Sequence, residues 1–288
     1  MKPSRSETLQ VGALRLHVRR WGDSAAPTLF LLHGWLDTSA TFQFMVDALS
    51  REWNLIAPDW RGFGRSAWTG EPYWFADYLA DLDALFDHYL PLGAPARIVA
   101  HSMGGNVASI YAAARPERVA ALVNLEGLSP VPSYLRPVPE RLRQFLEQKK
   151  SGLRKSTYAS REELAGRLVR ANPRLTPARA AFLAEHLGLE GEGGAILTAA
   201  DPWQRGVTPL PLHREQVAEC WRAITAPVLV VVGAESEIRR AFAGFEADYR
   251  ERLSWLVRGR EVVLENAGHN MHHDRPEAVA ELVEVFFL

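Results

Sequence analysis

Cysteine is nearly absent from this chain of 288 residues. Its one cysteine, Cys220, has no second cysteine with which to form an intramolecular disulfide or to build a multi-cysteine zinc site. The first residues lack the apolar stretch of a secretory signal, and no segment offers the roughly 20 consecutive apolar residues that span a bilayer. These absences favour a reducing compartment, and we expect a cytoplasmic location.

An excess of charge is also absent. The 33 lysines and arginines nearly balance the 34 aspartates and glutamates, which leaves a formal net charge of -1 at pH 7. Such a balance offers no electrostatic footprint for nucleic acid or for an anionic membrane surface, and we expect neither as a partner. Hydrophobic residues make up 47% of the chain, an ordinary value for a globular protein with a large core. The length favours one such core with a substantial insertion.

Short apolar runs alternate with amphipathic stretches in the first 128 residues. The runs predict buried strands, and the stretches with apolar residues at helical spacing predict helices. The predicted strands are Leu14–Val18, Thr28–Leu32, Trp53–Ala57, Ala96–Ala100 and Val119–Leu125, and the predicted helices are Thr38–Leu49, Phe75–Tyr89 and Met103–Ala114. This alternation indicates right-handed βαβ units, and so an α/β fold with a mostly parallel sheet.

The alternation stops after Leu128 and resumes near residue 227. Between Ser129 and Arg214 we find no convincing buried strand, only three short helical stretches at 142–148, 161–169 and 177–187. A strand at 227–232, a last strand at 260–265 and a last helix at 276–287 follow. We therefore predict a core made of residues 1–128 and 215–288, with residues 129–214 as a helical insertion.

The segment Ala-His-Ser-Met-Gly at residues 100–104 joins a predicted strand directly to a predicted helix. Small residues two before and two after Ser102 permit a tight turn that exposes its hydroxyl at the carboxyl edge of the sheet. The N-terminus of the following helix points amide donors toward that hydroxyl. An ordinary helix-capping serine is the alternative, but a cap does not need small residues on both sides. We predict that Ser102 is a nucleophile.

The loop His33-Gly34-Trp35 directly follows the predicted strand that ends at Leu32. In enzymes with a nucleophile on such a turn, one amide of the oxyanion hole belongs to the residue after the nucleophile, here Met103. The other belongs to a loop after an earlier strand, and Trp35 occupies that place. We expect His33 to hold this loop by hydrogen bonds rather than to act as a base.

His269 follows Gly268 on a loop after the last predicted strand. A histidine there lies at the same sheet edge as Ser102 and can act as its general base. His273 lies four residues later, so a metal site is the alternative. A zinc site would need further ligands, and the chain has no His-Glu-x-x-His pattern. We therefore expect no metal and no cofactor.

Several of these motifs occur together in the order and spacing of a known family. The motifs are His33-Gly34, the Asp-Trp-Arg-Gly-Phe-Gly-Arg-Ser segment at 59–66, the turn around Ser102, and Gly268-His269. Together they resemble the α/β-hydrolase superfamily over nearly the whole chain outside the insertion. The resemblance implies the α/β-hydrolase fold, with residues 129–214 as a helical cap that roofs the active site.

The acid that completes a catalytic triad is not at its usual place. The family commonly has an aspartate three residues after the glycine that ends the strand before the acid loop, and this position holds Ser236. Glu235 or Glu237 can serve if the loop is shifted. Glu126, at the end of the strand beside that of the nucleophile, resembles the acid in one group of haloalkane dehalogenases. We predict Glu126 as the acid, against the alternative that it only anchors the cap hinge.

A serine at the turn suits acyl transfer, in which an acyl-enzyme forms and water releases it. Dehalogenases and epoxide hydrolases of this fold need a carboxylate at that position instead. The leading prediction is a hydrolase that cleaves a carboxylic ester of a small or medium substrate. The same triad also fits cleavage of a carbon–carbon bond, a lactone or an amide, and a catalytically silent binding protein is an alternative of another class. Trp203 and Trp221 either line an apolar pocket or pack in the interior.

Overall fold

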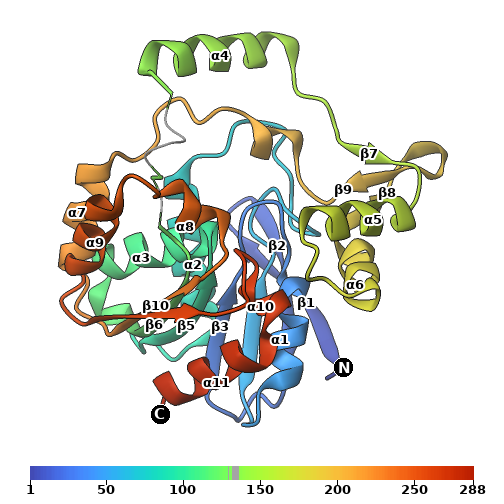
Figure 1. Cartoon of the computed structure of the whole chain (residues 1–288). Helices are drawn as coiled ribbons and strands as arrows, with labels where there is room; N and C mark the ends of the chain where they lie inside the picture. The colour runs from blue at the N-terminus through green and yellow to red at the C-terminus, as the bar shows by residue number, and fades with distance from the viewer. Residues whose placement is uncertain (129, 132–135) are drawn as a thin grey trace.

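The computed structural model describes residues 1–128, 130–131 and 136–288. An eight-stranded sheet runs through the molecule in the order β1-β2-β4-β3-β5-β6-β10-β11 (Figure 1). Its strands are Ser4–Val11 (β1), Leu14–Trp21 (β2), Thr28–Leu32 (β3), Asn54–Pro58 (β4), Ala96–His101 (β5), Val119–Leu125 (β6), Val228–Gly233 (β10) and Gly259–Leu264 (β11). β1 pairs antiparallel with β2, and β2 pairs antiparallel with β4. The other six strands of this sheet (β4, β3, β5, β6, β10 and β11) are parallel to one another. The predicted mostly parallel sheet is confirmed.

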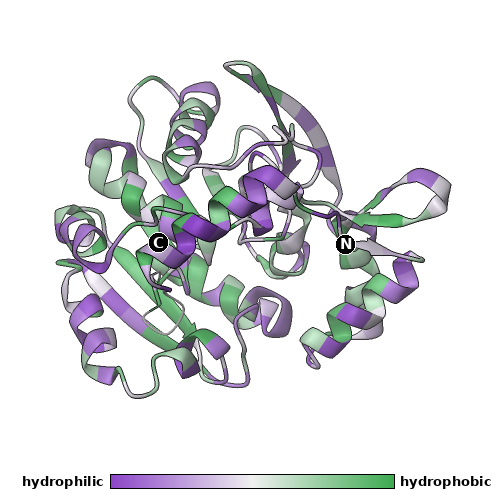
Figure 2. Cartoon of the chain, turned by 90° about the horizontal axis from the view of Figure 1, so that it is seen from above, coloured by the Kyte–Doolittle hydropathy of each residue, from purple (hydrophilic) through white to green (hydrophobic). Residues whose placement is uncertain are grey.

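Helices cover both faces of the sheet. One face packs on α2 (Phe75–Tyr89), α3 (Met103–Ala114) and α7 (Arg214–Ala223), and the other on α1 (Gln43–Ala48) and α11 (Pro276–Phe286). Successive strand residues point to opposite faces, so Phe30 lies in one core cluster while Leu29 and Leu31 lie in the other. Figure 2 shows the hydrophobic residues gathered along the central strands. This burial on both faces explains the continuous apolar runs of the sequence.

The structure differs from the sequence-based expectation at two elements near the N-terminus. β1 was not expected, because its side chains are mostly exposed and polar, and only Leu9 is buried. β1 pairs with β2 along its whole length, from Ser4 opposite Trp21 to Val11 opposite Leu14. The predicted helix Thr38–Leu49 is a 3₁₀ turn at Ser39–Phe42 followed by the short α1.

The insertion folds as helices with a small sheet of its own. Its helices are Val138–Ser151 (α4), Arg161–Ala171 (α5) and Pro177–Leu187 (α6), and 3₁₀ turns form at Glu192–Gly194 and Pro202–Arg205. Strands Thr157–Tyr158 (β7), Gly188–Glu190 (β8) and Ile196–Thr198 (β9) form an antiparallel sheet separate from the main one. The sequence did not predict these strands, because two or three residues are too few to show alternation. The expected start of the insertion, Ser129, lies outside the described residues.

The insertion has its own small core beside the main sheet. Leu164, Leu183 and Leu187 of α5 and α6 pack with Phe44 of α1, which ties this core to the larger domain. Figure 1 shows α4 apart from α5 and α6, above the rest of the molecule. Between β10 and α11 the chain also forms α8 (Glu237–Ala241), α9 (Glu246–Ser254) and α10 (Met271–Asp274). None of the helices in the described part of the chain has both the length and the apolarity that crossing a membrane requires.

Candidate active site

Ser102 lies between β5 and α3 on the turn that the sequence predicts. Its backbone has φ 51° and ψ -115°, a left-handed conformation that is strained for a residue with a side chain. Its amide donates to the carbonyl of Leu125 at 2.9 Å. A side chain at Gly104 would clash with the carbonyl oxygen of Leu32, so only glycine lets α3 pass this close to β3. The strained turn thus holds the hydroxyl at the carboxyl edge of the sheet.

His269 lies on the loop after β11 and meets Ser102 at this edge. Its Nε2 is 2.9 Å from Ser102 Oγ, and its Nδ1 is 2.6 Å from Glu126 Oε2. A nitrogen that faces a carboxylate carries the proton, so Nδ1 donates to Glu126 and Nε2 accepts from the Ser102 hydroxyl. The His101 Nε2–H donates to the backbone carbonyl of His269 at 3.0 Å and so fixes the loop that carries His269.

Glu126 follows β6 directly and is 2% exposed. Its backbone, like that of Ser102, has a positive φ of 57°. The carboxylate accepts three hydrogen bonds: Oε1 from the amide of Gly233 at 2.7 Å, and Oε2 from Ser236 Oγ at 2.6 Å and from His269. A buried carboxylate needs such partners, because leaving water without them costs several kcal/mol. Glu126 is thus held in one orientation by two neighbouring strand ends.

The two alternative acids point elsewhere. Glu235 is half-exposed and forms an ion pair with Arg174. Glu237 lies exposed in the first turn of α8. Ser236, at the usual aspartate position, is fully buried, and its hydroxyl both accepts from the amide of Ile238 and donates to Glu126. Of the predicted acids, the structure therefore brings only Glu126 to His269.

The His33-Gly34-Trp35 loop runs close beside Ser102. The Trp60 amide donates to His33 Nε2 at 2.9 Å, so the proton lies on Nδ1, which donates to the carbonyl of Gly34 at 2.7 Å. Burial lowers the pKa of His33 to about 4 and keeps the ring neutral. A Cβ on Gly34 would lie 2.8 Å from His101 Nδ1 and 3.1 Å from the Cβ of Ser102, which explains the glycine. His33 holds the loop by hydrogen bonds, as expected from the sequence.

Asp59, the first residue of the 59–66 motif, anchors the loops behind this site. It is buried and accepts hydrogen bonds from the amides of Ser39 and Arg65 at 2.7 and 3.0 Å. His17 Nδ1 lies 2.9 Å from its carboxylate. Burial opposes its ionisation, but these hydrogen bonds outweigh burial and hold the pKa of Asp59 below its usual range. The motif therefore acts on the site through the loops that it ties together.

Buried histidines stack behind His269. The His101 ring lies 4.6 Å from that of His269 and 4.5 Å from that of His272, and the His272 and His273 rings are 4.2 Å apart. Burial holds the pKa of His101 and of His272 well below the usual value, and it lowers the pKa of His273 to about 3. Burial also raises the pKa of the neighbouring Asp37 to about 7. At neutral pH His101, His272 and His273 are therefore uncharged.

Two of these histidines and Asp37 form the group of described residues that could hold a metal ion. Donor atoms of Asp37, His101 and His272 lie within 4.8 Å of one another. The Nδ1 atoms of His101 and His272 have no hydrogen-bond partner among the described residues. The pair that the sequence offered as a metal alternative is arranged otherwise: His269 is bonded to the Ser102 and Glu126 side chains, and His273 to Thr41 Oγ1 at 2.5 Å.

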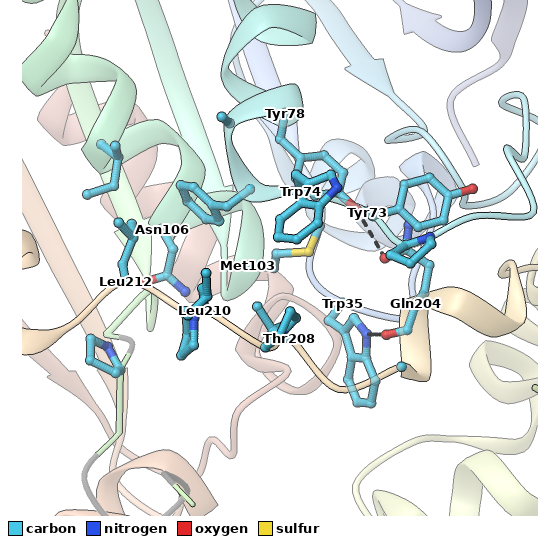
Figure 3. A pocket seen from close by; sticks show the side chains of 18 of the residues that line it. Trp35, Tyr73, Trp74, Tyr78, Met103, Asn106, Gln204, Thr208, Leu210 and Leu212 are labelled. Carbon is cyan, nitrogen blue, oxygen red and sulfur yellow. Dashed lines mark hydrogen bonds between the residues drawn. The ribbon is translucent and has the colours of Figure 1, made fainter. Parts of the chain in front are cut away.

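A cavity of about 680 Å³ opens onto Ser102 (Figure 3). Residues between 72 and 79, helices α3 and α7, and the segment 203–212 line it. Trp203 and Trp221 both lie on its wall, and Trp221 also packs against Trp255 at 6.2 Å. The Trp35 indole donates to the carbonyl of Gln204 at 2.6 Å and links the insertion to the loop beside Ser102. The cavity is thus shared by the core and the insertion.

Comparison with known families agrees with this arrangement. A family model described as the alpha/beta hydrolase fold matches residues 27–276. The chain belongs to the α/β-hydrolase family. The resemblance inferred from the motifs is therefore confirmed, and so is the α/β-hydrolase fold.

Individual relatives of this α/β hydrolase carry hydrolase names. A serine hydrolase-like protein of Danio rerio is 28% identical over 284 residues, which cover 96% of this chain and 85% of that protein. Lipase LipV of Mycobacterium tuberculosis is 38% identical over 111 residues, 38% of this chain and 41% of the lipase. The solved thioesterase domain from the curacin biosynthetic pathway has a TM-score of 0.85 at 24% identity, covering 98% of this chain and 99% of that domain, and so shares the fold. Fold and relatives together support a hydrolase.

The neutral buried histidines predict a loss of stability in acid. The unfolded chain binds protons at histidine near pH 6.5, whereas folded His33 and His273 bind them only near pH 4 and 3. Between these values the unfolded state holds more protons, so the free energy of unfolding falls as pH falls, by up to about 1.4 kcal/mol per pH unit for each histidine. The raised pKa of Asp37 acts in the opposite direction between about pH 4 and 7.

A variant comparison isolates the histidine contribution. Urea unfolding should be measured for His273→Gln between pH 4.5 and 6.5. The free energy of unfolding of this variant should change less with pH than that of the wild type, by up to about 1.4 kcal/mol per pH unit. His88→Gln, which changes an exposed histidine at the end of α2, should keep the wild-type slope. Equal slopes for wild type and His273→Gln would contradict the assignment of His273 as a buried neutral ring.

Proposed function

We propose that this protein is a serine esterase that hydrolyses a carboxylic ester through an acyl-enzyme. One observation carries the proposal: the unbroken hydrogen-bonded line from Ser102 Oγ through His269 to Glu126, with distances of 2.9 and 2.6 Å, at the wall of a cavity. A silent binding protein has no need of this alignment. The proposal includes a reducing compartment such as the cytoplasm, which the single cysteine supports.

The reaction begins at the Ser102 hydroxyl. As Oγ attacks the ester carbonyl, its proton passes to His269 Nε2, and the Nδ1–H of the imidazolium remains hydrogen-bonded to Glu126. The tetrahedral intermediate collapses when His269 gives that proton to the leaving alkoxide, and the alcohol departs from the acyl-enzyme. Water then attacks the acyl carbonyl by the same route, and the carboxylic acid and free Ser102 are released.

The oxyanion of each tetrahedral intermediate needs two preorganised donors. We assign these to the backbone amides of Met103, at the start of α3, and of Trp35, on the loop that Gly34 brings beside Ser102. Each such donor stabilises the transition state by about 3 kcal/mol. The helix dipole of α3 adds to the positive potential at Met103.

Residues 129–214 act as a cap in this proposal. The segment 203–212 supplies a large part of the cavity wall, and the hydrogen bond from the Trp35 indole to the Gln204 carbonyl holds it over the nucleophile. A water-excluding roof strengthens the electrostatic interactions beneath it. Exchange of cap residues should therefore change substrate choice more than it changes the chemistry at Ser102.

Replacement of the nucleophile gives the first test. Ser102→Ala should lower kcat for p-nitrophenyl esters by roughly 10³-fold or more, because only the oxyanion donors and substrate binding remain. Labelling by a fluorophosphonate probe should be lost while the circular dichroism spectrum is unchanged. Ser151→Ala, at the exposed end of α4, serves as the control and should keep full activity. Near-wild-type turnover by Ser102→Ala would remove the basis of the proposal.

Replacement of the acid gives the second test. Glu126→Gln should lower kcat by about 10³ to 10⁴-fold with a modest change in KM, because the amide no longer stabilises the imidazolium or fixes its tautomer. Glu235→Gln and Glu237→Gln are matched controls in the neighbouring loop and should have mild effects. A nearly silent Glu126→Gln, together with an essential glutamate at 235 or 237, would assign the acid to that loop instead.

A further inference from the structure

We propose that the ester taken by this site carries its larger group as an uncharged, apolar chain or ring of medium size, and that the site discriminates against esters with a carboxylate on that group. The inference rests on the proposed esterase function and adds the chemical class of the substrate. The cavity beside Ser102 carries it, through the composition of its wall, its volume, and the partners of its polar groups.

The wall of the cavity is apolar and largely aromatic. Figure 3 shows aromatic side chains from two sides of the cavity, Trp74 and Tyr78 on one and Trp35 on the other, with Met103 between them. Leu210 and Leu212 close the wall from the segment before α7. Within the described part of the chain, no lysine, arginine, histidine, aspartate or glutamate lines the cavity. The wall therefore offers dispersion contacts and no compensating charge.

The polar side chains on the wall do not offer a carboxylate site. Tyr78 donates its hydroxyl to Gln204 Oε1 at 3.0 Å, and Tyr73 donates its hydroxyl to Asp201 Oδ2 at 2.9 Å. Asn106 and Thr208, also on the wall, are neutral. The nearby Lys149 lies over the Trp203 ring and is paired with Glu71. A carboxylate drawn into this cavity would lose part of its hydration without gaining a cation, which disfavours its binding.

The volume sets the size of the group. About 680 Å³ lies within the range of about 300–1,000 Å³ typical of pockets for drug-sized ligands, and far exceeds what an acetyl group fills. Each methylene transferred from water to an apolar wall favours binding by a factor of about four. If this binding is also realised in the transition state, kcat/KM rises with chain length until the cavity is filled.

Three methyl esters test the class directly. Methyl octanoate should exceed methyl butanoate in kcat/KM by about 250-fold, which follows from four methylenes at about fourfold each. The monomethyl ester of octanedioic acid has the same length but ends in a carboxylate, and it should be cleaved at least about 100-fold less efficiently than methyl octanoate. A higher kcat/KM for octyl acetate than for methyl octanoate would place the apolar chain on the alcohol side of the ester.

A charge placed in the wall should reverse the discrimination. Leu212 is partly buried on the cavity wall, outside the catalytic residues. Leu212→Arg should raise kcat/KM for the octanedioate half-ester relative to methyl octanoate by at least tenfold, because the guanidinium pairs with the carboxylate. Leu212→Met, of similar volume, should keep the wild-type ratio. If Leu212→Arg is still labelled at Ser102 by a methyl fluorophosphonate but keeps the wild-type ratio, the apolar wall does not set the discrimination.

The outcomes separate this inference from the proposed function. Equal kcat/KM for methyl octanoate and the octanedioate half-ester overturns the substrate class. A higher kcat/KM for methyl butanoate than for both methyl octanoate and octyl acetate also overturns it. If no ester turns over, labelling by octyl and methyl fluorophosphonates decides. Faster labelling of Ser102 by the octyl compound supports the apolar class, equal labelling overturns it, and no labelling overturns the esterase proposal itself.

Discussion

The hydrogen bond from His269 Nδ1 to Glu126 Oε2 is the constraint on which the arrangement of the site depends. It joins two loops at the carboxyl edge of the sheet, and it fixes which imidazole nitrogen faces Ser102. The carboxylate is buried, so it needs the amide of Gly233 and the hydroxyl of Ser236 as further partners. Because β6 and β10 are parallel neighbours, their ends meet at one edge, and these partners come within reach without a long loop.

The backbone is strained at two residues of the site that lie at this same sheet edge. Ser102 and Glu126 both have left-handed φ values directly after neighbouring strands, and such strained backbone is common at functional sites. The packing of the two core faces supports this strain, since β5 and β6 are almost entirely buried between helices. The glycines at 34 and 104 let the flanking loop and helix approach as closely as these turns require.

Much of this arrangement was predictable because local sequence carries it. The strand–serine–helix pattern, the central strands and the long α2 follow from periodicity and small residues, and the serine at 236 pointed to a displaced acid. What the sequence could not show depends on tertiary contacts. β1 exists through pairing with β2, the short strands of the insertion lack a pattern, and the three hydrogen bonds that hold Glu126 join residues far apart in the chain. The stack of His101, His272 and His273 appears in the sequence only as scattered histidines.

That stack has an electrostatic consequence for the proposed chemistry. During ester cleavage His269 becomes an imidazolium, and a second cation at the His101 ring, 4.6 Å away, would oppose this charge. Burial prevents that by holding the pKa of His101 and His272 well below the usual value. His101 can therefore support the His269 loop through its Nε2–H without competing for the proton. The imidazolium of the transition state therefore has the Glu126 carboxylate at its Nδ1 and the neutral His101 ring beside it.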